Sequence, residues 1–125
     1  MVELLLDSVI LIDHLNGIAQ STDWLASEDW RRLSISPITR AEVLAGAATE
    51  EVTHISNLLD SFQCLPLDAR AADRAAALRR DKRLRLPDAF QVALAELNRL
   101  QFVTRNTRDF GSADFEYVLI PYRLP

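Results

Sequence analysis

Four carboxylate residues of this chain stand where a predicted strand meets a predicted helix: Asp7, Glu42, Asp88 and Asp109. Asp7 directly follows an apolar run, and a charge beside a core is costly unless it is paired, hydrogen-bonded or bound to a metal. Several carboxylates in one cleft would also raise one another's pKa values unless a cation neutralised them. Hard oxygen ligands suit Mg²⁺ or Mn²⁺, and such an ion can activate water for the hydrolysis of a phosphodiester.

Each of these acids also has a purely structural interpretation. Asp7 could cap the helix predicted from Ser8, because aspartate is among the best N-cap residues. Glu42 could lie in solvent or pair with Arg40 or Arg79, and a first-turn acid such as Asp88 is favourable without any ligand. Taken singly, these interpretations are at least as good as metal binding. The coincidence of four acids at strand–helix junctions favours a shared metal site.

Other potential ligands are expected to lie outside this site. Asp13 lies about one and a half helical turns beyond Asp7, so it should face elsewhere and be exposed or paired with an arginine. The two histidines, His14 and His54, show no metal-like spacing with the single cysteine, Cys64. The sequence therefore offers an oxygen-only site rather than a thiolate or imidazole site.

The succession of apolar and amphipathic segments predicts an α/β domain with a mainly parallel sheet covered on both faces. Strands are predicted at 2–7, 31–36, 63–67, 101–104 and 116–120. Helices are predicted at 8–17, 21–30, 37–47, 49–62, 68–84 and 86–100. In this scheme Ser21 or Thr22 caps the second helix, and Asp109 lies in the loop after the fourth strand. Strand ends and the helix starts that follow them share one edge of an open parallel sheet, where ligands usually bind.

The composition is that of one soluble globular domain spanning residues 1–125. Hydrophobic residues make up 49% of the chain and charged residues 26%, which is enough for a sizeable core. No apolar run approaches the roughly 18 residues of a membrane-spanning helix, and the N-terminus does not resemble a signal peptide. With one cysteine there is no intramolecular disulfide, so we expect a cytoplasmic protein with no membrane partner.

Basic residues are concentrated in one segment although the net charge is −4. Residues 70–85, "RAADRAAALRRDKRLR", hold six arginines and one lysine against two aspartates. The simplest interpretation of such a run is a solvated helix face. The segment nevertheless leads directly into one acidic junction, and two further arginines follow the fourth predicted strand. The arginines that could border the acidic cleft and bind a polyanion are Arg83, Arg85, Arg105 and Arg108.

The chain resembles the PIN-domain ribonucleases, specifically the VapC toxins of bacterial toxin–antitoxin pairs. The matching pieces are "LLLDSVILIDHL", "SISPITRAEVLAGA", "LRLPDAFQVALAE", "FVTRNTRDF" and "VLIPY". They stand in the family's order with roughly its spacing, and together they cover nearly the whole chain. The resemblance implies a PIN-like three-layer α/β/α fold with a short central sheet.

The resemblance also implies roles for individual residues. The catalytic acids, which would bind Mg²⁺ or Mn²⁺, are Asp7, Glu42, Asp88 and Asp109. The residues that would support the site or contact substrate are Ser8, Thr39, Thr104 and Asn106. Many PIN nucleases have an acid where Asn106 stands, so either Asn106 or Asp109 completes the site. Gln91 interrupts the small and aliphatic stripe that the family usually has after Asp88, and it could make a polar contact beside the site.

The function implied by the resemblance is that of a metal-dependent endoribonuclease acting as a toxin. The four arginines would then hold an RNA backbone, a cognate VapB-like antitoxin would cover the cleft, and the toxin would form a homodimer. The main alternative is a noncatalytic PIN-like module that binds RNA or protein. A receiver-type phosphoacceptor is disfavoured because paired acids after the first strand are absent. A dehalogenase-like phosphatase is disfavoured because Val9 stands where its second acid would be.

Overall fold

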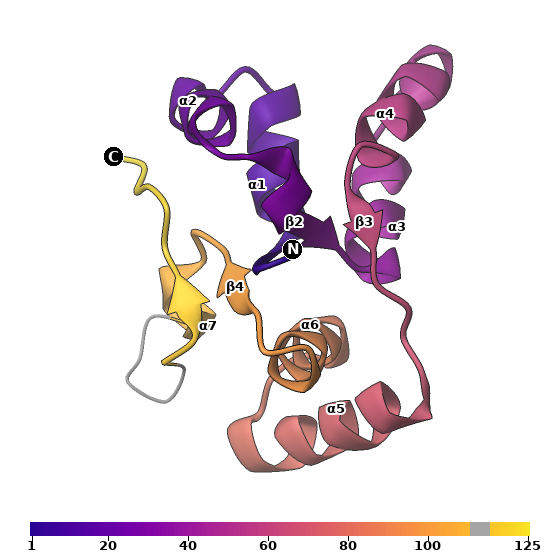
Figure 1. Ribbon diagram of the computed structural model, residues 1–125, viewed down its shortest axis with the longest axis vertical. Coiled ribbons are helices and arrows are strands. Elements are labelled where there is room, and N and C mark those ends of the chain that lie inside the picture. Colours follow the sequence, from indigo (N-terminus) through magenta and orange to yellow (C-terminus); the bar gives the residue numbers. More distant parts are fainter. Residues whose placement is uncertain (111–115) are drawn as a thin grey trace.

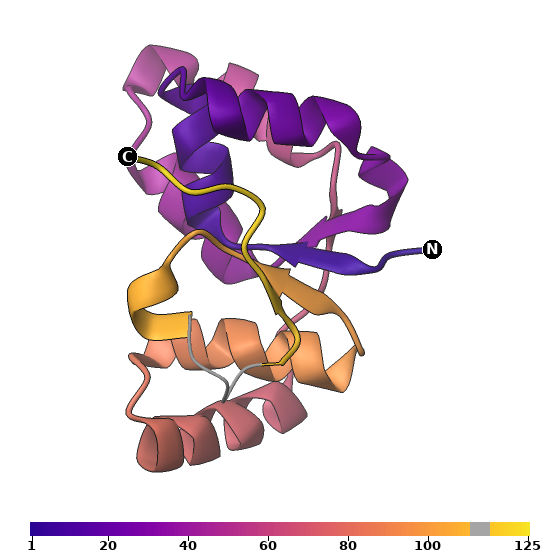
Figure 2. The same cartoon turned by 90° about the vertical axis from the view of Figure 1, so that its left-hand side faces the viewer.

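The computed structural model describes residues 1–110 and 116–125, and it is a five-stranded parallel sheet between two layers of helices (Figure 1, Figure 2). The strand order is β3-β2-β1-β4-β5. The strands are β1 (Leu4–Leu6), β2 (Leu33–Ile35), β3 (Gln63–Cys64), β4 (Gln101–Val103) and β5 (Val118–Leu119). The predicted three-layer α/β/α architecture is confirmed, and every strand pair of the described residues is parallel.

The strand order reverses at the centre of the sheet. β1 pairs with β2 on one side and with β4 on the other. The chain first adds β2 and β3 on one side of β1, then crosses over to add β4 and β5 on the other side. A crevice outside the carboxyl ends of the strands forms at such a reversal, and it is the usual ligand site of open parallel sheets. β1 and β4, which lie at this point, lead into Asp7 and Thr104.

One face of the sheet is covered by the helices of the first half of the chain (Figure 1). These are α1 (Ser8–Leu15), α2 (Ala19–Ser27), α3 (Pro37–Ala45) and α4 (Val52–Leu59), with the 3-10 helices η1 (Trp30–Arg32) and η2 (Thr49–Glu51). Successive strand residues face opposite sides of a sheet, so Leu4 and Leu6 belong to this core. Pro37 begins α3 at a position where the missing N–H has no cost, and the Ser36 side chain caps that helix.

The other face is covered by α5 (Ala69–Lys82) and α6 (Leu86–Leu97), and Leu5 points into this second core. The Phe102 ring of β4 meets the Phe110 ring edge-to-face, with the two centroids 5.3 Å apart. Phe110 ends the one-turn helix α7 (Thr107–Phe110), so its burial holds the segment after β4 against the core. No helix of the described residues is both long and apolar enough to cross a bilayer.

Two local predictions were wrong. The second helix begins at Ala19 rather than at 21, and neither Ser21 nor Thr22 caps it. The Ser21 hydroxyl donates to the carbonyl oxygen of Ile10 at 2.5 Å, and the Thr22 hydroxyl is hydrogen-bonded to the His14 ring at 2.8 Å. Asp109 was expected in a loop but lies in α7, which the buried ring of Phe110 anchors. Both errors arise from contacts with parts of the fold that the local sequence does not contain.

Candidate active site

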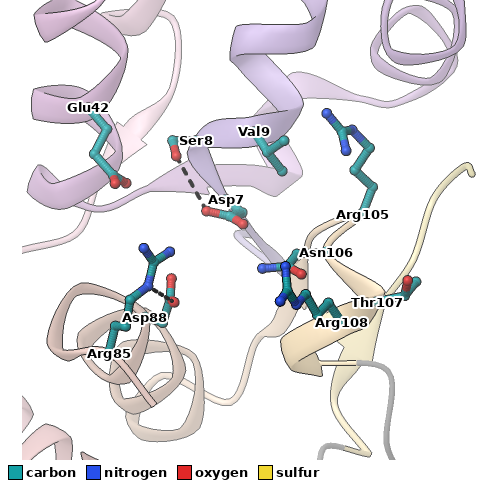
Figure 3. Close-up of a pocket in the computed structure, with 10 residues that line it drawn as sticks. All are labelled: Asp7, Ser8, Val9, Glu42, Arg85, Asp88, Arg105, Asn106, Thr107 and Arg108. Atoms are coloured by element: carbon teal, nitrogen blue, oxygen red, sulfur yellow. Dashed lines mark hydrogen bonds and ion pairs between the residues drawn. The ribbon is translucent and has the colours of Figure 1, made fainter. Parts of the chain in front are cut away.

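A pocket of about 450 Å³ opens at the carboxyl ends of β1 and β4 (Figure 3). Figure 3 shows Asp7 at its centre, with Glu42, Asp88 and Arg85 to one side and Asn106, Arg105 and Arg108 to the other. The lining residues are Asp7, Ser8, Val9, Glu42, Arg85, Asp88, Arg105, Asn106, Thr107 and Arg108. Three of the four acids singled out in the sequence therefore share one pocket, although Asp7 follows β1, Glu42 lies in α3 and Asp88 lies in α6.

The Asp7 carboxylate is buried and faces this pocket. Its side chain accepts a 2.7 Å hydrogen bond from the Thr104 hydroxyl and a longer one of 3.5 Å from Ser8. Burial raises the pKa of Asp7 to about 6; the Thr104 hydrogen bond opposes this shift, while the nearby charges of Asp88 and Glu42 add to it. Asp7 occupies the N-cap position of α1, but its side chain makes no cap hydrogen bond with the described backbone. Helix capping therefore does not account for this acid.

Asp88 lies in the first turn of α6, one residue after the proline that helps to start that helix. Its carboxylate is 3.5 Å from the Arg85 guanidinium, and its side chain is only 16% exposed. Burial raises the pKa of Asp88, the Arg85 charge opposes this shift, and Asp109 and Glu42 add to it. The acids of the site thus act on one another electrostatically, as the sequence pattern predicted.

Glu42 is exposed on α3 and extends into the pocket (Figure 3). The two arginines considered as its partners are engaged elsewhere. Arg40 donates to Asp60 at 2.9 Å, and Arg79 donates to the carbonyl oxygen of Leu84 at 3.0 Å. Within the described residues, Glu42 is therefore not held by either of these arginines.

Asn106 and Asp109, the two candidates for completing the site, face different pockets. Asn106 lines the acidic pocket, whereas Asp109 lines a neighbouring one of about 230 Å³ that also includes Asp88. The Asn106 side-chain amide donates to Asp109 at 2.9 Å, and its backbone N–H donates to the Thr104 hydroxyl at 3.1 Å. Asn106 consequently shares the pocket of Asp7, and its hydrogen bond to Asp109 links the two pockets.

The four candidate arginines differ in what they contact. Arg85 and Arg108 line both the pocket that contains Asp7 and the neighbouring pocket that contains Asp109, and Arg83 lines the neighbouring pocket. Arg105 also reaches the acidic pocket, but its guanidinium forms two hydrogen bonds with Asp13, at 2.5 and 3.0 Å. Of the two alternatives expected for Asp13, exposure or pairing with an arginine, the pairing is confirmed, and only 4% of Asp13 is exposed.

A buried polar chain runs beneath the pocket between α3 and α6. The Ser36 hydroxyl donates to the Gln91 side-chain oxygen at 2.6 Å, and the Gln91 amide donates to the Thr39 hydroxyl at 2.7 Å. Thr39 in turn donates to the carbonyl oxygen of Leu6 at 3.1 Å. The interruption of an apolar stripe by Gln91 was the signal for this contact in the sequence. Nothing in the sequence pointed to Ser36 beyond its helix-capping position.

The donors around the pocket fit a hard divalent cation. Its described lining residues supply carboxylate, amide and hydroxyl oxygens, and they include neither Cys nor His. A buried Asp7 with a raised pKa beside two further acids is the environment that a cation would relieve. In residues 1–110 and 116–125, however, no three Cys, His, Asp or Glu side chains are grouped closely enough to hold a metal ion. Asp88 is instead oriented toward Arg85.

Comparison with known proteins gives a consistent result over the whole chain. The PIN domain model matches residues 4–116. The chain is 35% identical over 130 residues to Ribonuclease VapC10 of Mycobacterium tuberculosis, covering 98% of this chain and 95% of that one. A toxin–antitoxin complex from Klebsiella pneumoniae matches with a TM-score of 0.89 and 35% identity, covering 98% and 100% of the two chains. FitAcB from Neisseria gonorrhoeae, at 24% identity and a TM-score of 0.80 over 97% and 99%, supports the fold.

Proposed function

Because this chain belongs to the PIN-domain family, we propose that it is a Mg²⁺- or Mn²⁺-dependent endoribonuclease that acts as the toxin of a toxin–antitoxin pair. One observation carries the proposal: the buried Asp7 carboxylate lies in a pocket with Glu42 and Asp88 at the reversal point of the sheet. The full-length similarity to a protein named as a ribonuclease supports the same function. Its substrate would be cellular RNA in the cytoplasm.

The residues that would hold the cation are Asp7, Glu42 and Asp88, directly or through water, with Asn106 or Asp109 completing the set. When bound, the cation would supply activation of water and neutralisation of charge on the scissile phosphate. Thr104 and Ser8 orient the Asp7 carboxylate through their hydroxyl groups. Because Arg85 already neutralises part of the Asp88 charge, the cation and Arg85 would compete for that carboxylate.

The same pocket suggests how a partner would inhibit the protein. A basic side chain placed among Asp7, Glu42 and Asp88 would satisfy their charge and exclude the cation. We therefore propose that a VapB-like antitoxin binds over this pocket and that the toxin itself is a homodimer. The similarity to a toxin–antitoxin complex over the whole of both chains supports such an assembly.

The proposed activity is tested with the purified chain, free of any partner, and a single-stranded RNA. We expect cleavage in Mg²⁺ or Mn²⁺ and none in excess chelator, because the cation would supply activation of water and would relieve the repulsion among the acids. Gel analysis of end-labelled RNA measures the cleavage, and re-addition of the metal serves as the control. Intact RNA that is bound but never cleaved in either metal would instead favour the noncatalytic binding module.

Arg85 and Arg108 should contribute to RNA binding through phosphate contacts at the rim of the pocket. Replacing both with glutamine in a noncleaving Asp7→Asn background should weaken RNA binding. It should also reduce the slope of log affinity against log salt by about 0.7 per lost phosphate contact, or about 1.4 in all. Fluorescence anisotropy at several salt concentrations measures both quantities.

The matched control for this experiment is Arg31→Gln, which removes an exposed arginine that is paired with Asp29 and does not line the pocket. It should leave the salt slope unchanged. An equal effect of the control and the double variant would show that Arg85 and Arg108 contribute only general charge. Arg105 is unsuitable for this test because its guanidinium is bound to Asp13.

A further inference from the structure

We infer that Gln91 is a positioning residue whose side-chain amide sets the relative places of the three acids in the pocket. The inference rests on the proposed metal-dependent function, because it concerns how Asp7, Glu42 and Asp88 are brought into register for a cation. Gln91 itself does not line the pocket.

The buried chain of hydrogen bonds joins the three elements that carry these acids. Gln91 of α6 bonds to both Ser36 and Thr39, which lie at the start of α3. Thr39 continues the chain to the backbone carbonyl oxygen of Leu6, the last residue of β1. One side-chain amide therefore connects α6 to α3, and through Thr39 to the central strand of the sheet.

Three residues of this hydrogen-bonded network lie close in sequence to the three acids. Leu6 directly precedes Asp7, and residues three apart on a helix lie on neighbouring positions of one face. Asp88 lies three residues before Gln91, and Glu42 lies three residues after Thr39. A sliding or rotation of α6 against α3 would break the Gln91 bonds and, in the same motion, displace Asp88 from Glu42.

The polar character of this buried hydrogen-bond network favours a positioning role over simple packing. Ser36 and Thr39 are each 0% exposed and Gln91 is 1% exposed, in a helix whose neighbouring Val92 and Ala93 are fully buried. A buried amide is costly without partners, and an aliphatic residue would fill this place without that cost. Here the partners are complete: no buried side-chain nitrogen or oxygen in the described part of the chain lacks one. Because hydrogen bonds are directional, a network in which every polar group has a partner fixes one position of α6 against α3, whereas apolar contacts would allow the helices to shift.

The inference is tested by measuring Mn²⁺ binding to the full chain, using the electron paramagnetic resonance signal of free Mn²⁺. Gln91→Met keeps the length of the side chain but removes its hydrogen bonds. Residues that orient metal ligands typically contribute about 10- to 100-fold to metal affinity, so we expect Mn²⁺ binding to weaken by that factor. RNA binding measured in chelator should be unchanged, because the arginines at the rim of the pocket are untouched.

Two further variants separate positioning from stability. Val92→Ala removes buried apolar volume from the next residue of α6 and should lower the melting temperature with little effect on Mn²⁺ affinity. The double variant Thr39→Val with Gln91→Met replaces both partners of the Gln91–Thr39 hydrogen bond by apolar groups of similar shape. This leaves only the Ser36 hydroxyl without its Gln91 acceptor and limits the loss of stability. It should remain folded and still bind Mn²⁺ weakly.

The outcomes distinguish this inference from the proposed function. Wild-type Mn²⁺ affinity in Gln91→Met or in the double variant would overturn the positioning role while leaving the metal site intact. An equal loss of affinity in Val92→Ala would also overturn it, because general loosening of α6 would then suffice. Absence of Mn²⁺ binding by the wild type would overturn the proposed metal site, and this inference with it.

Discussion

Asp7→Asn is expected to reduce metal-dependent RNA cleavage by about 10³-fold or more, because a cation contributes several kcal/mol to stabilising the charge of the transition state. The substitution keeps the shape of the side chain and an oxygen that can accept the 2.7 Å hydrogen bond from Thr104. It removes the charge that shares the pocket with Glu42 and Asp88. Loss of activity would therefore report on the charge rather than on the packing of β1 and α1.

The same substitution should not destabilise the metal-free protein. The pKa of Asp7 rises from its ordinary value of 3.8 to about 6 on folding, so its ionisation disfavours the folded state. This penalty is absent below about pH 4, grows as the pH rises to about 6 and stays constant above, where it reaches at most about 3 kcal/mol. Since asparagine does not ionise, the variant should be as stable as the wild type near pH 4 and more stable near pH 7.5.

Thermal unfolding in chelator and in Mn²⁺ measures this difference, alongside cleavage of RNA. In chelator at pH 7.5 the variant should melt at or above the temperature of the wild type, whereas Mn²⁺ should stabilise only the wild type. Asp23→Asn is the matched control, because Asp23 is an exposed acid on α2 that does not line the pocket. Full cleavage activity in a well-folded Asp7→Asn variant would refute the proposed mechanism.

Asp13→Ala is expected to lower the free energy of unfolding by about 2–4 kcal/mol. Removing one partner of a fully buried ion pair costs about 3–5 kcal/mol. We expect a smaller loss for Asp13→Ala because 32% of the Arg105 side chain is exposed, so water can partly solvate the charge that is left. Asp13 also accepts a 2.9 Å hydrogen bond from Tyr122, so it holds the last residues of the chain against α1. Since Arg105 lies between Thr104 and Asn106, part of the loss should fall on the loop that supports Asp7.

The pH dependence of this effect has the opposite sign to that of Asp7. The hydrogen bond from Arg105 is the main reason that the pKa of Asp13 lies below its ordinary value. The stabilisation is therefore complete above about pH 4 and is lost as the pH falls through the lowered pKa of the folded state. The difference in melting temperature between wild type and variant should be largest near neutral pH, at roughly 10 °C, and should shrink in acid.

Thermal and urea unfolding of both proteins measure this loss. Tyr122→Phe is the appropriate comparison, because it removes one hydrogen bond from Asp13 but leaves the ion pair, and it should cost about 1 kcal/mol. A loss below 1 kcal/mol for Asp13→Ala would mean that solvent replaces the carboxylate at Arg105. The ion pair would then be incidental to the stability of the loop.

Local residue patterns were enough to predict most of the strands and helices and the edge of the sheet at which three of the acids gather. An apolar run such as Leu4–Leu6 predicts a buried strand, Pro37 predicts the start of a helix, and Asp68 caps α5 through the backbone N–H of Ala71 at 2.9 Å. These features depend on residues a few positions apart. The order of such elements, together with the family resemblance, was sufficient to predict the three-layer fold and the pocket shared by Asp7, Glu42 and Asp88, but not the place of Asp109 in α7 beside a neighbouring pocket.

Only the tertiary structure decided which partner each polar side chain has. Asp7 could have capped its own helix but accepts a hydrogen bond from Thr104, 97 residues away, because β1 and β4 pair side by side. Asp13 was expected to be either exposed or paired with an arginine; packing buries it and pairs it with Arg105, 92 residues away. The place of Gln91 beneath the pocket likewise depends on the packing of α6 against α3. Such choices follow from the burial of distant segments against one another, which local propensity and spacing do not encode.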